Sequence, residues 1–136
     1  MTCVETYATL RIFSRTLHPA VISGSLGIDA TDPVPLDPAS KYRPRREVNY
    51  WGWCTRQHVA SKTDNSLHIA ALLALVQGKA AELEQLRSVG CETDICCFWV
   101  SDGQGGPSLD VAVMRELARL GLGIWWDVYV DSERKA

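Results

Sequence analysis

The segment 66–89 constrains the fold more than any other, because its apolar residues recur every three or four positions along its length. That spacing places them on one face of an amphipathic helix. One of residues 64–66 (Asp, Asn or Ser) can cap the beginning of this helix, and Gly90 can end it. Gly78 weakens the middle by about 1 kcal/mol relative to alanine, but burial of the apolar face should override this cost. We therefore expect one continuous helix that covers a sheet. Its apolar residues are Ile69, Leu72, Leu73, Val76, Ala80, Leu83 and Leu86.

The remaining apolar residues are spaced as in strands. Residues 7–14 and 124–130 alternate regularly, as half-buried strands do. Residues 47–56 are rich in tryptophan and predict another strand, and residues 91–100 are apolar on both faces in their second half, which favours a central strand. Residues 30–44 hold four of the six prolines, so we expect a loop there with one weak edge strand.

Two shorter helices complete the pattern. Pro19 stands where a first helical residue would, and Gly27 stands where a C-terminal cap would. Ser108 is expected to cap a third helix, which Gly121 ends. The resulting order is β-α-(β)-β-α-β-α-β.

This order predicts an α+β fold. Its first six elements follow the ferredoxin-like order β-α-β-β-α-β, and a C-terminal helix and strand extend it. We expect a mixed sheet of four or five strands with helices mainly on one face. The chain has 136 residues, the usual size of one domain, which we expect to span residues 1–136.

Charge and composition exclude several classes of function. The formal net charge is −2, so no global field directs the chain to nucleic acid or to an anionic membrane. No apolar run approaches the ~18 residues of a membrane helix, and no secretory signal is visible, so we expect no membrane partner. The five cysteines form no C-x-x-C motif, and this odd number fits reduced thiols in the cytoplasm.

The sequence carries no motif for catalysis, a metal or a cofactor. Adjacent Cys96 and Cys97 point to opposite faces of a strand, so they cannot easily coordinate the same zinc ion. The glycine-rich loop 101–108 lacks the lysine with which a P-loop contacts phosphates. No histidine has a sequence-evident partner for a hydrolytic triad. The three histidines are His18, His58 and His68.

Several features together resemble a known family. They are the strand Thr9-Leu10-Arg11-Ile12, the turn with Pro19, the run Leu26-Gly27-Ile28-Asp29-Ala30-Thr31, a tryptophan strand near Trp53, the long helix ending at Gly90, and the last strand Asp127-Val128-Tyr129-Val130. Their order resembles the bacterial family labelled domain of unknown function 4279 over roughly residues 6–130. The resemblance implies no catalytic residues. In size and style the family is similar to small bacterial immunity proteins that neutralise toxins.

Residues 41–46 form the one basic cluster. The cations are Lys41, Arg43, Arg45 and Arg46, and aromatic residues follow them. Basic residues beside aromatic ones can bind single-stranded nucleic acid. The acidic overall charge argues against that partner, so the segment is a solvated loop or a contact for a protein partner.

The tryptophans indicate a binding surface. Trp125, Asp127 and Tyr129 share one face of the last strand, while Trp126 points to the other face. If helices cover only the Trp126 face, an aromatic face is left exposed, and we expect the strand with Trp51 and Trp53 to belong to it. The alternative is that residues 30–48 fold over this face and bury it. Arg11 on the first strand could pair with Asp127 across the sheet.

These observations favour a non-enzymatic cytoplasmic binding module, whose aromatic face or basic loop occludes a protein partner. Its concrete version is an immunity protein against a bacterial toxin. The alternative is a small-molecule-binding protein or enzyme with a pocket between the sheet and the proline-rich loop. Asp127, Tyr129, Trp53 and Arg11 would line that pocket.

Overall fold

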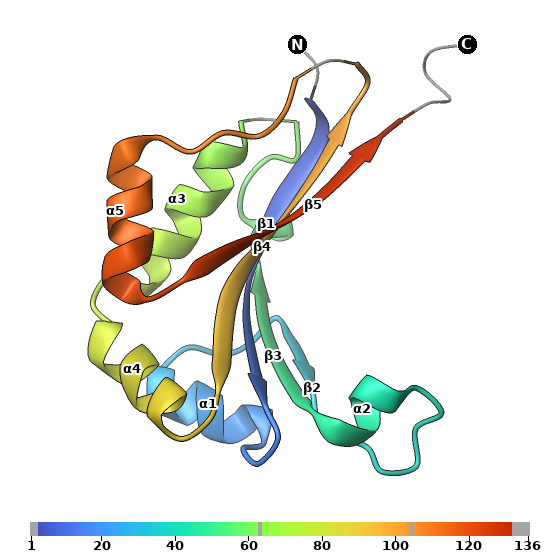
Figure 1. Cartoon of the computed structure of the whole chain (residues 1–136), viewed down its shortest axis with the longest axis vertical. Helices are drawn as coiled ribbons and strands as arrows, with labels where there is room; N and C mark the ends of the chain where they lie inside the picture. The colour runs from blue at the N-terminus through green and yellow to red at the C-terminus, as the bar shows by residue number, and fades with distance from the viewer. Residues whose placement is uncertain (1–2, 63, 104, 132–136) are drawn as a thin grey trace.

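The computed structural model describes residues 3–62, 64–103 and 105–131. Figure 1 shows the path of the chain through its strands and helices. In chain order, the elements are β1 (Cys3–Ser14), α1 (Pro19–Leu26), β2 (Asp32–Val34), α2 (Arg43–Glu47), β3 (Asn49–Cys54), the 3-10 helix η1 (Thr55–Gln57), α3 (Asn65–Val76), α4 (Ala80–Ser88), β4 (Glu92–Ser101), α5 (Val111–Leu120) and β5 (Gly123–Val130).

The described strands form one five-stranded sheet in the order β2-β3-β1-β4-β5. β1 is the central strand and pairs antiparallel with β3 and with β4. β2 pairs antiparallel with β3, whereas β5 runs parallel to β4. The α+β class and the mixed sheet that the sequence predicts are therefore confirmed.

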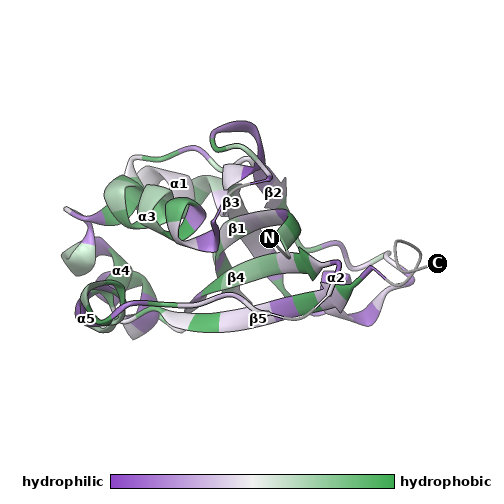
Figure 2. Cartoon of the chain, turned by 90° about the horizontal axis from the view of Figure 1, so that it is seen from above, coloured by the Kyte–Doolittle hydropathy of each residue, from purple (hydrophilic) through white to green (hydrophobic). Residues whose placement is uncertain are grey.

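The two faces of the sheet have different surroundings. Figure 1 shows α1, α3, α4 and α5 together on one side of the sheet, and the view in Figure 2 agrees. Ala8, Leu10 and Ile12 of β1 point to that side and are fully buried. They form the core with residues of the helices, such as Ile22 and Leu72. The alternate residues of β1 lie on the opposite face.

The expected single helix over 66–89 is wrong, because two helices occupy this segment. Asp64 caps α3 by accepting a hydrogen bond from the Ser66 N–H, as expected. The helix stops at Val76, and α4 begins at Ala80 after a turn in which the Lys79 N–H donates to the Val76 carbonyl. Gly78 lies in this turn, where its low helix propensity favours a break. The break lets α3 pack on β1 while α4 packs on α1 and α5.

Two other boundaries also differ from expectation. Asp110, and not Ser108, caps α5, because its carboxylate accepts the Val113 N–H at 2.8 Å. Residues 43–47, where the sequence predicted the end of a loop and the start of a strand, instead form the short helix α2, in which Arg43 pairs with Glu47 across one turn. Figure 1 shows that α2 projects from the end of β2 and β3 on the side away from the other helices.

Candidate functional site

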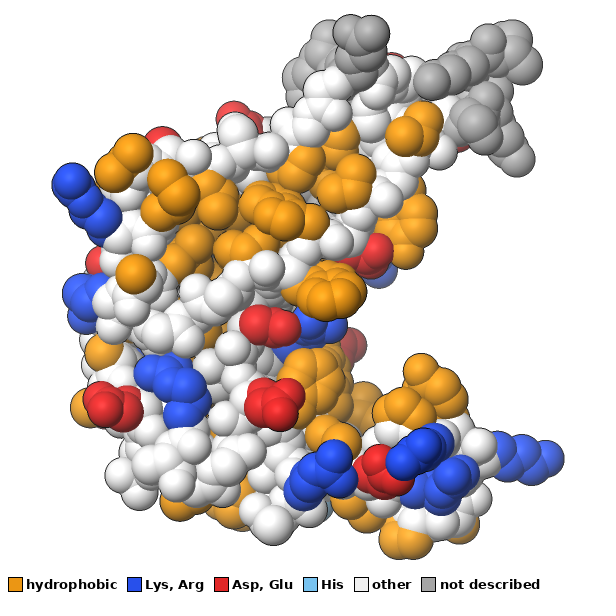
Figure 3. Space-filling model, in the orientation of Figure 1, with side chains coloured by type: hydrophobic (Ala, Val, Ile, Leu, Met, Phe, Trp, Pro, Cys, Tyr) orange, Lys and Arg blue, Asp and Glu red, His pale blue; other side chains and the backbone are white. Residues whose placement is uncertain are grey.

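We call the face of the sheet that lies against α1, α3, α4 and α5 the helical face, and the opposite one the open face. Its side chains come from alternate positions of the four longer strands, as the register of the pairs requires. Figure 3 shows that the molecule is hollowed on this side, between β5 and α2. The central residues of the open face are Tyr7, Thr9, Arg11 and Phe13 of β1, Tyr50 and Gly52 of β3, Asp94, Cys96 and Phe98 of β4, and Trp125, Asp127 and Tyr129 of β5.

Three aromatic rings and an arginine form a row across the open face. Phe98 of β4 stacks on Tyr7 of β1, with 4.6 Å between ring centroids, and lies 5.5 Å from the ring of Tyr129 on β5. The Arg56 guanidinium lies over the Tyr7 ring at 4.1 Å, within the range of a cation–π contact. The row presents a preordered aromatic surface with a cation at one end. Sequence reasoning missed Phe98 and Arg56, because the pattern does not reveal which strands are neighbours.

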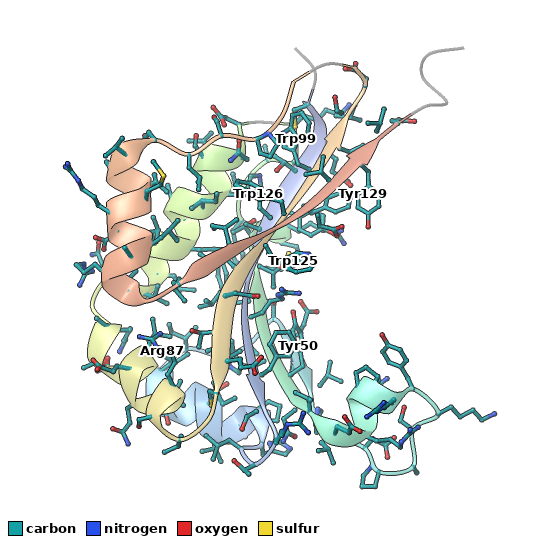
Figure 4. The ribbon with its side chains drawn as sticks, viewed as in Figure 1. Tyr50, Arg87, Trp99, Trp125, Trp126 and Tyr129 are labelled. Atoms are coloured by element: carbon teal, nitrogen blue, oxygen red, sulfur yellow. The ribbon has the colours of Figure 1, made fainter. Side chains whose placement is uncertain are left out.

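On β5, the aromatic side chains of Trp125 and Tyr129 are exposed on the open face. Their exposed fractions are 60% and 51%. Figure 4 shows both side chains, together with Tyr50, on the hollowed side of the sheet. A hydrogen bond to Asp127 raises the pKa of the Tyr129 phenol, because the bond favours the protonated form. The alternative that residues 30–48 cover these side chains is wrong.

Arg11 forms an ion pair in the middle of the open face, but with Asp94 and not with Asp127. Its Nε and Nη2 atoms donate to the two carboxylate oxygens of Asp94, each at 2.7 Å. This pairing raises the pKa of the Arg11 guanidinium. The expected partner is wrong because β4 lies between β1 and β5, so the nearest carboxylate belongs to β4. The charge of Arg11 is therefore largely compensated within the chain.

Tyr50 covers the β3 end of the open face. Its ring packs against Phe13 at 5.3 Å between centroids and lies over Gly52. A Cβ at position 52 would come within 2.5 Å of the Tyr50 hydroxyl oxygen, so only glycine leaves room for this ring. Burial raises the pKa of the Tyr50 phenol to about 12. This end of the face is accordingly more closed than the β5 end.

The expectation that Trp51 and Trp53 belong to the same face as Trp125 is wrong. Trp51 pairs with Ile12 and Trp53 with Leu10, and these partners point toward the helices. Trp51 is fully buried, and its indole Nε1–H donates to the Ser23 hydroxyl at 2.9 Å. Trp53 packs against the core and stacks on His58. Alternation shows that both tryptophans share a face, but only the register with β1 decides which face.

Trp126 lies on the helical side of β5, as the alternation predicts. Figure 4 shows it on the same side of the sheet as Trp99, opposite Trp125. Its cover is incomplete, because 37% of its surface remains exposed, whereas Trp99 is 4% exposed. The helical face of β5 is thus only partly buried.

The basic cluster lies on α2 and on the turn before it, across the hollow from β5 (Figure 3). Arg43, Arg45 and Arg46 are all exposed. Arg43 pairs with Glu47 at 3.0 Å, and Arg46 donates to the carbonyls of Ser40 and Lys41. Glu47 thus compensates the charge of Arg43, whereas the bonds of Arg46 to neutral carbonyls fix its position without changing its charge.

His68 is buried and fully hydrogen-bonded. Its Nε2 donates to the Ala60 carbonyl at 2.9 Å, so Nδ1 accepts from the Thr55 hydroxyl. The Thr55 oxygen in turn accepts the Ala8 N–H at 3.0 Å. Burial lowers the pKa of the His68 imidazole. The chain of bonds ties α3 to β1, which is a structural role.

The other candidate ligands are dispersed. His18 caps α1 by accepting the Ala20 N–H. Cys96 and Cys97 point to opposite faces, as expected, and Cys97 is fully buried. All five cysteines are free thiols. In residues 3–62, 64–103 and 105–131, no group of three or more His, Cys, Asp or Glu is arranged to hold a metal ion.

The proline-rich segment borders a cavity of about 770 Å³ between α1 and residues 29–35, whose walls include His18, Ser23 and Pro33. The sequence predicted a different pocket, between the sheet and the proline-rich loop. The expected lining by Asp127, Tyr129, Trp53 and Arg11 is wrong, because Trp53 lies on the helical face and β5 is at the far edge of the sheet from β2.

The fold and this surface define an α+β protein that keeps one face of its sheet under helices and leaves the other open. Residues 4–131 match the family described as Domain of unknown function (DUF4279), and the chain belongs to that family, as the resemblance in its sequence predicted. Neither the curated proteins nor the solved structures contain a match to the chain. In the part of the chain that the structure describes, no helix is both long and apolar enough to cross a membrane.

Proposed function

We propose that this protein is a non-enzymatic binding module whose open face covers a surface of a protein partner. The observation that carries the proposal is the exposure of Trp125 and Tyr129 on β5, where Tyr129 ends a preordered aromatic row. Aromatic side chains that are held in place by neighbours lose little entropy on binding, and Trp, Tyr and Arg dominate the energy of interfaces. An exposed patch of this kind marks an interaction site.

The charges of the open face favour a protein over a nucleic acid. Arg11 is neutralised by Asp94, and the carboxylate of Asp127 balances the charge of Arg56. Nucleic-acid affinity depends on uncompensated Lys and Arg that contact phosphates. The net charge of −2 points in the same direction.

The concrete partner that we propose is a bacterial toxin, which this chain would neutralise by occluding its functional surface. A small chain with one large preordered face can cover a partner without any chemistry of its own, which supports this version. We propose the cytoplasm as the compartment, which the five free thiols support.

We further propose that β1, α1, β2, β3, the α3–α4 pair and β4 are a ferredoxin-like unit to which α5 and β5 are added. The strand order β2-β3-β1-β4 with antiparallel neighbours supports this relationship.

The binding proposal is tested by co-purification from the native cell, identification of the partner by mass spectrometry, and calorimetry with the purified pair. We expect Trp125→Ala to weaken binding by about 2 kcal/mol or more, roughly 30-fold. Val21→Ala is the matched control, because Val21 is 50% exposed and belongs to α1, which lies on the other side of the sheet from the open face. For a toxin, the wild type should inhibit its activity and Trp125→Ala should inhibit it less. Equal binding by the wild type and Trp125→Ala would overturn the proposal.

A second candidate function, binding of a small molecule, is favoured by the cavity between α1 and residues 29–35. Its volume of about 770 Å³ falls in the range of ligand pockets. Screening small molecules by NMR tests this candidate. Chemical-shift changes confined to residues such as His18 and Ala30 would support it, and a screen without such changes would count against it.

A further inference from the structure

The two edges of the sheet are built differently. The β2 edge has three residues, includes Pro33 and is followed by Pro35. Short length and proline are the usual means by which an edge strand avoids pairing with another chain. The β5 edge has eight residues, Gly123–Val130, with no proline and one charged residue, Asp127. It therefore lacks the protection that β2 has.

The backbone of β5 directs half of its hydrogen-bonding groups to the outer edge. The Asp131 N–H donates to the Ser101 carbonyl on β4 at 2.7 Å, so odd-numbered residues direct their backbone groups toward β4. Because the direction alternates along a strand, Ile124, Trp126, Val128 and Val130 direct theirs outward. Figure 2 shows β5 as the outermost strand on that side.

The side chains of β5 are apolar on both faces of the sheet. Trp125 and Tyr129 lie on the open face, and Trp126, Val128 and Val130 lie on the helical face. The exposed fractions of the last three rise from 37% to 47% and 56% toward the end of the strand. A strand that pairs with this edge must itself be apolar on both faces, and the β5 strand of a second copy meets that requirement.

We propose that β5 pairs antiparallel with β5 of a second copy about a two-fold axis at Val128, which joins two sheets into one. In this register Val128 opposes Val128 and Trp126 opposes Val130 on the helical face. On the open face Asp127 opposes Tyr129 of the second copy, so its carboxylate faces a hydroxyl. The two open faces then continue into each other, with the exposed aromatic residues of both copies near the axis.

The alternative registers are less favourable. An axis at Asp127 would place two carboxylates directly opposite each other, which destabilises a strand pair. An axis at Trp126 would bring the second copy against Ile124, which packs on the core. On the helical face of β5 the exposed fraction rises from Trp126 to Val130, and an axis at Val128 centres the contact on these residues.

Sedimentation velocity of the purified chain tests the dimer. We expect a species of twice 15.1 kDa whose share of the total rises with protein concentration. Val128→Pro should be monomeric with an unchanged far-UV circular dichroism spectrum, because this residue directs its N–H away from β4 and its loss removes no bond within the sheet. Val128→Lys, which places two like charges on the axis, should also be monomeric. Val21→Lys is the control and should remain a dimer.

Oxidative cross-linking tests the register. Val128→Cys should form an interchain disulfide, because residues opposed on the axis have Cα atoms about 5.5 Å apart. Trp126→Cys should not cross-link to itself, because it opposes position 130. The wild type under the same oxidation controls for its own five thiols.

A monomeric wild type at several hundred micromolar, a dimeric Val128→Lys, or cross-linking at position 126 in place of 128 would overturn the proposal. None of these results depends on whether the open face binds another protein.

Discussion

Arg11 and Asp94 face each other on neighbouring strands and are joined by two hydrogen bonds of 2.7 Å. Their side chains retain 22% and 29% of their exposed surface. The pair is therefore partly buried, and its bidentate contact is stronger than a fully exposed ion pair on the protein surface.

The coupling between these two residues should be measurable. We expect Asp94→Ala to destabilise the fold by about 1–2 kcal/mol, because it leaves the guanidinium without its partner on a half-buried face. The double variant with Arg11→Ala should be more stable than the sum of the two single variants predicts, by about 1 kcal/mol. Urea unfolding of the four proteins measures this cycle. Additive effects would show that the pair contributes nothing beyond its two separate side chains.

His68 should make stability depend on pH below neutrality. Because burial lowers the pKa of the folded imidazole below its ordinary 6.5, the unfolded chain binds a proton first as the pH falls. The contribution of the neutral imidazole is then fully present above pH 6.5 and declines below it. Urea unfolding at pH 7.5 and at successively lower values should show this decline. In His68→Gln, the decline of the free energy of unfolding that begins near pH 6.5 should disappear. In the control His58→Gln, which changes an exposed position, that decline should remain.

Three tryptophans should respond differently to truncation. Trp51→Ala should cost about 3–5 kcal/mol, because the side chain is fully buried and its loss also leaves the Ser23 hydroxyl without this donor. Trp126→Ala should cost less, about 1–3 kcal/mol, because the side chain is 37% exposed. Trp125→Ala should change stability by less than about 1 kcal/mol. Thermal melts rank the three, and a Trp125→Ala protein that unfolds would contradict the assignment of faces.

Gly52→Ala should displace the ring of Tyr50. The added Cβ would lie 2.5 Å from the Tyr50 hydroxyl oxygen, so the side chain must move toward solvent. We expect the pKa of its phenol to fall from about 12 toward the ordinary value of 10. Ultraviolet titration of the tyrosines follows this change. Gly24→Ala, where the added Cβ meets nothing within 4 Å, should leave the titration unaltered. A Tyr50 that still titrates near 12 in Gly52→Ala would show that burial has another cause.

All five thiols should be free and unequal in reactivity. Burial raises the pKa of the Cys97 thiol to about 12, so it should be alkylated far more slowly than the half-exposed Cys54 at pH 8. Mass spectrometry of the native protein under non-reducing conditions, followed by timed alkylation, measures both properties. An intramolecular disulfide between Cys96 and Cys97 would contradict their positions on opposite faces of β4.

The sequence by itself determined the longer strands and which of their side chains share a face. Alternation in residues 7–14 and 124–130 predicted that Trp125, Asp127 and Tyr129 share a face, and that Trp126 lies opposite. Helical spacing predicted the apolar faces of α3 and α4, although not the break near Gly78. These properties follow from local periodicity, which each segment carries in its own residues.

Only the tertiary structure decided which residues meet. Arg11 pairs with Asp94 because β4 lies beside β1, and no pattern within either strand specifies that order. Trp51 is buried because the register of β3 aligns it with Ile12, and a shift of one residue would have turned it to the open face. The row of Tyr129, Phe98 and Tyr7 likewise crosses three strands. Strand order and register depend on how the faces of all the elements are buried together, and periodicity within one segment cannot encode that choice.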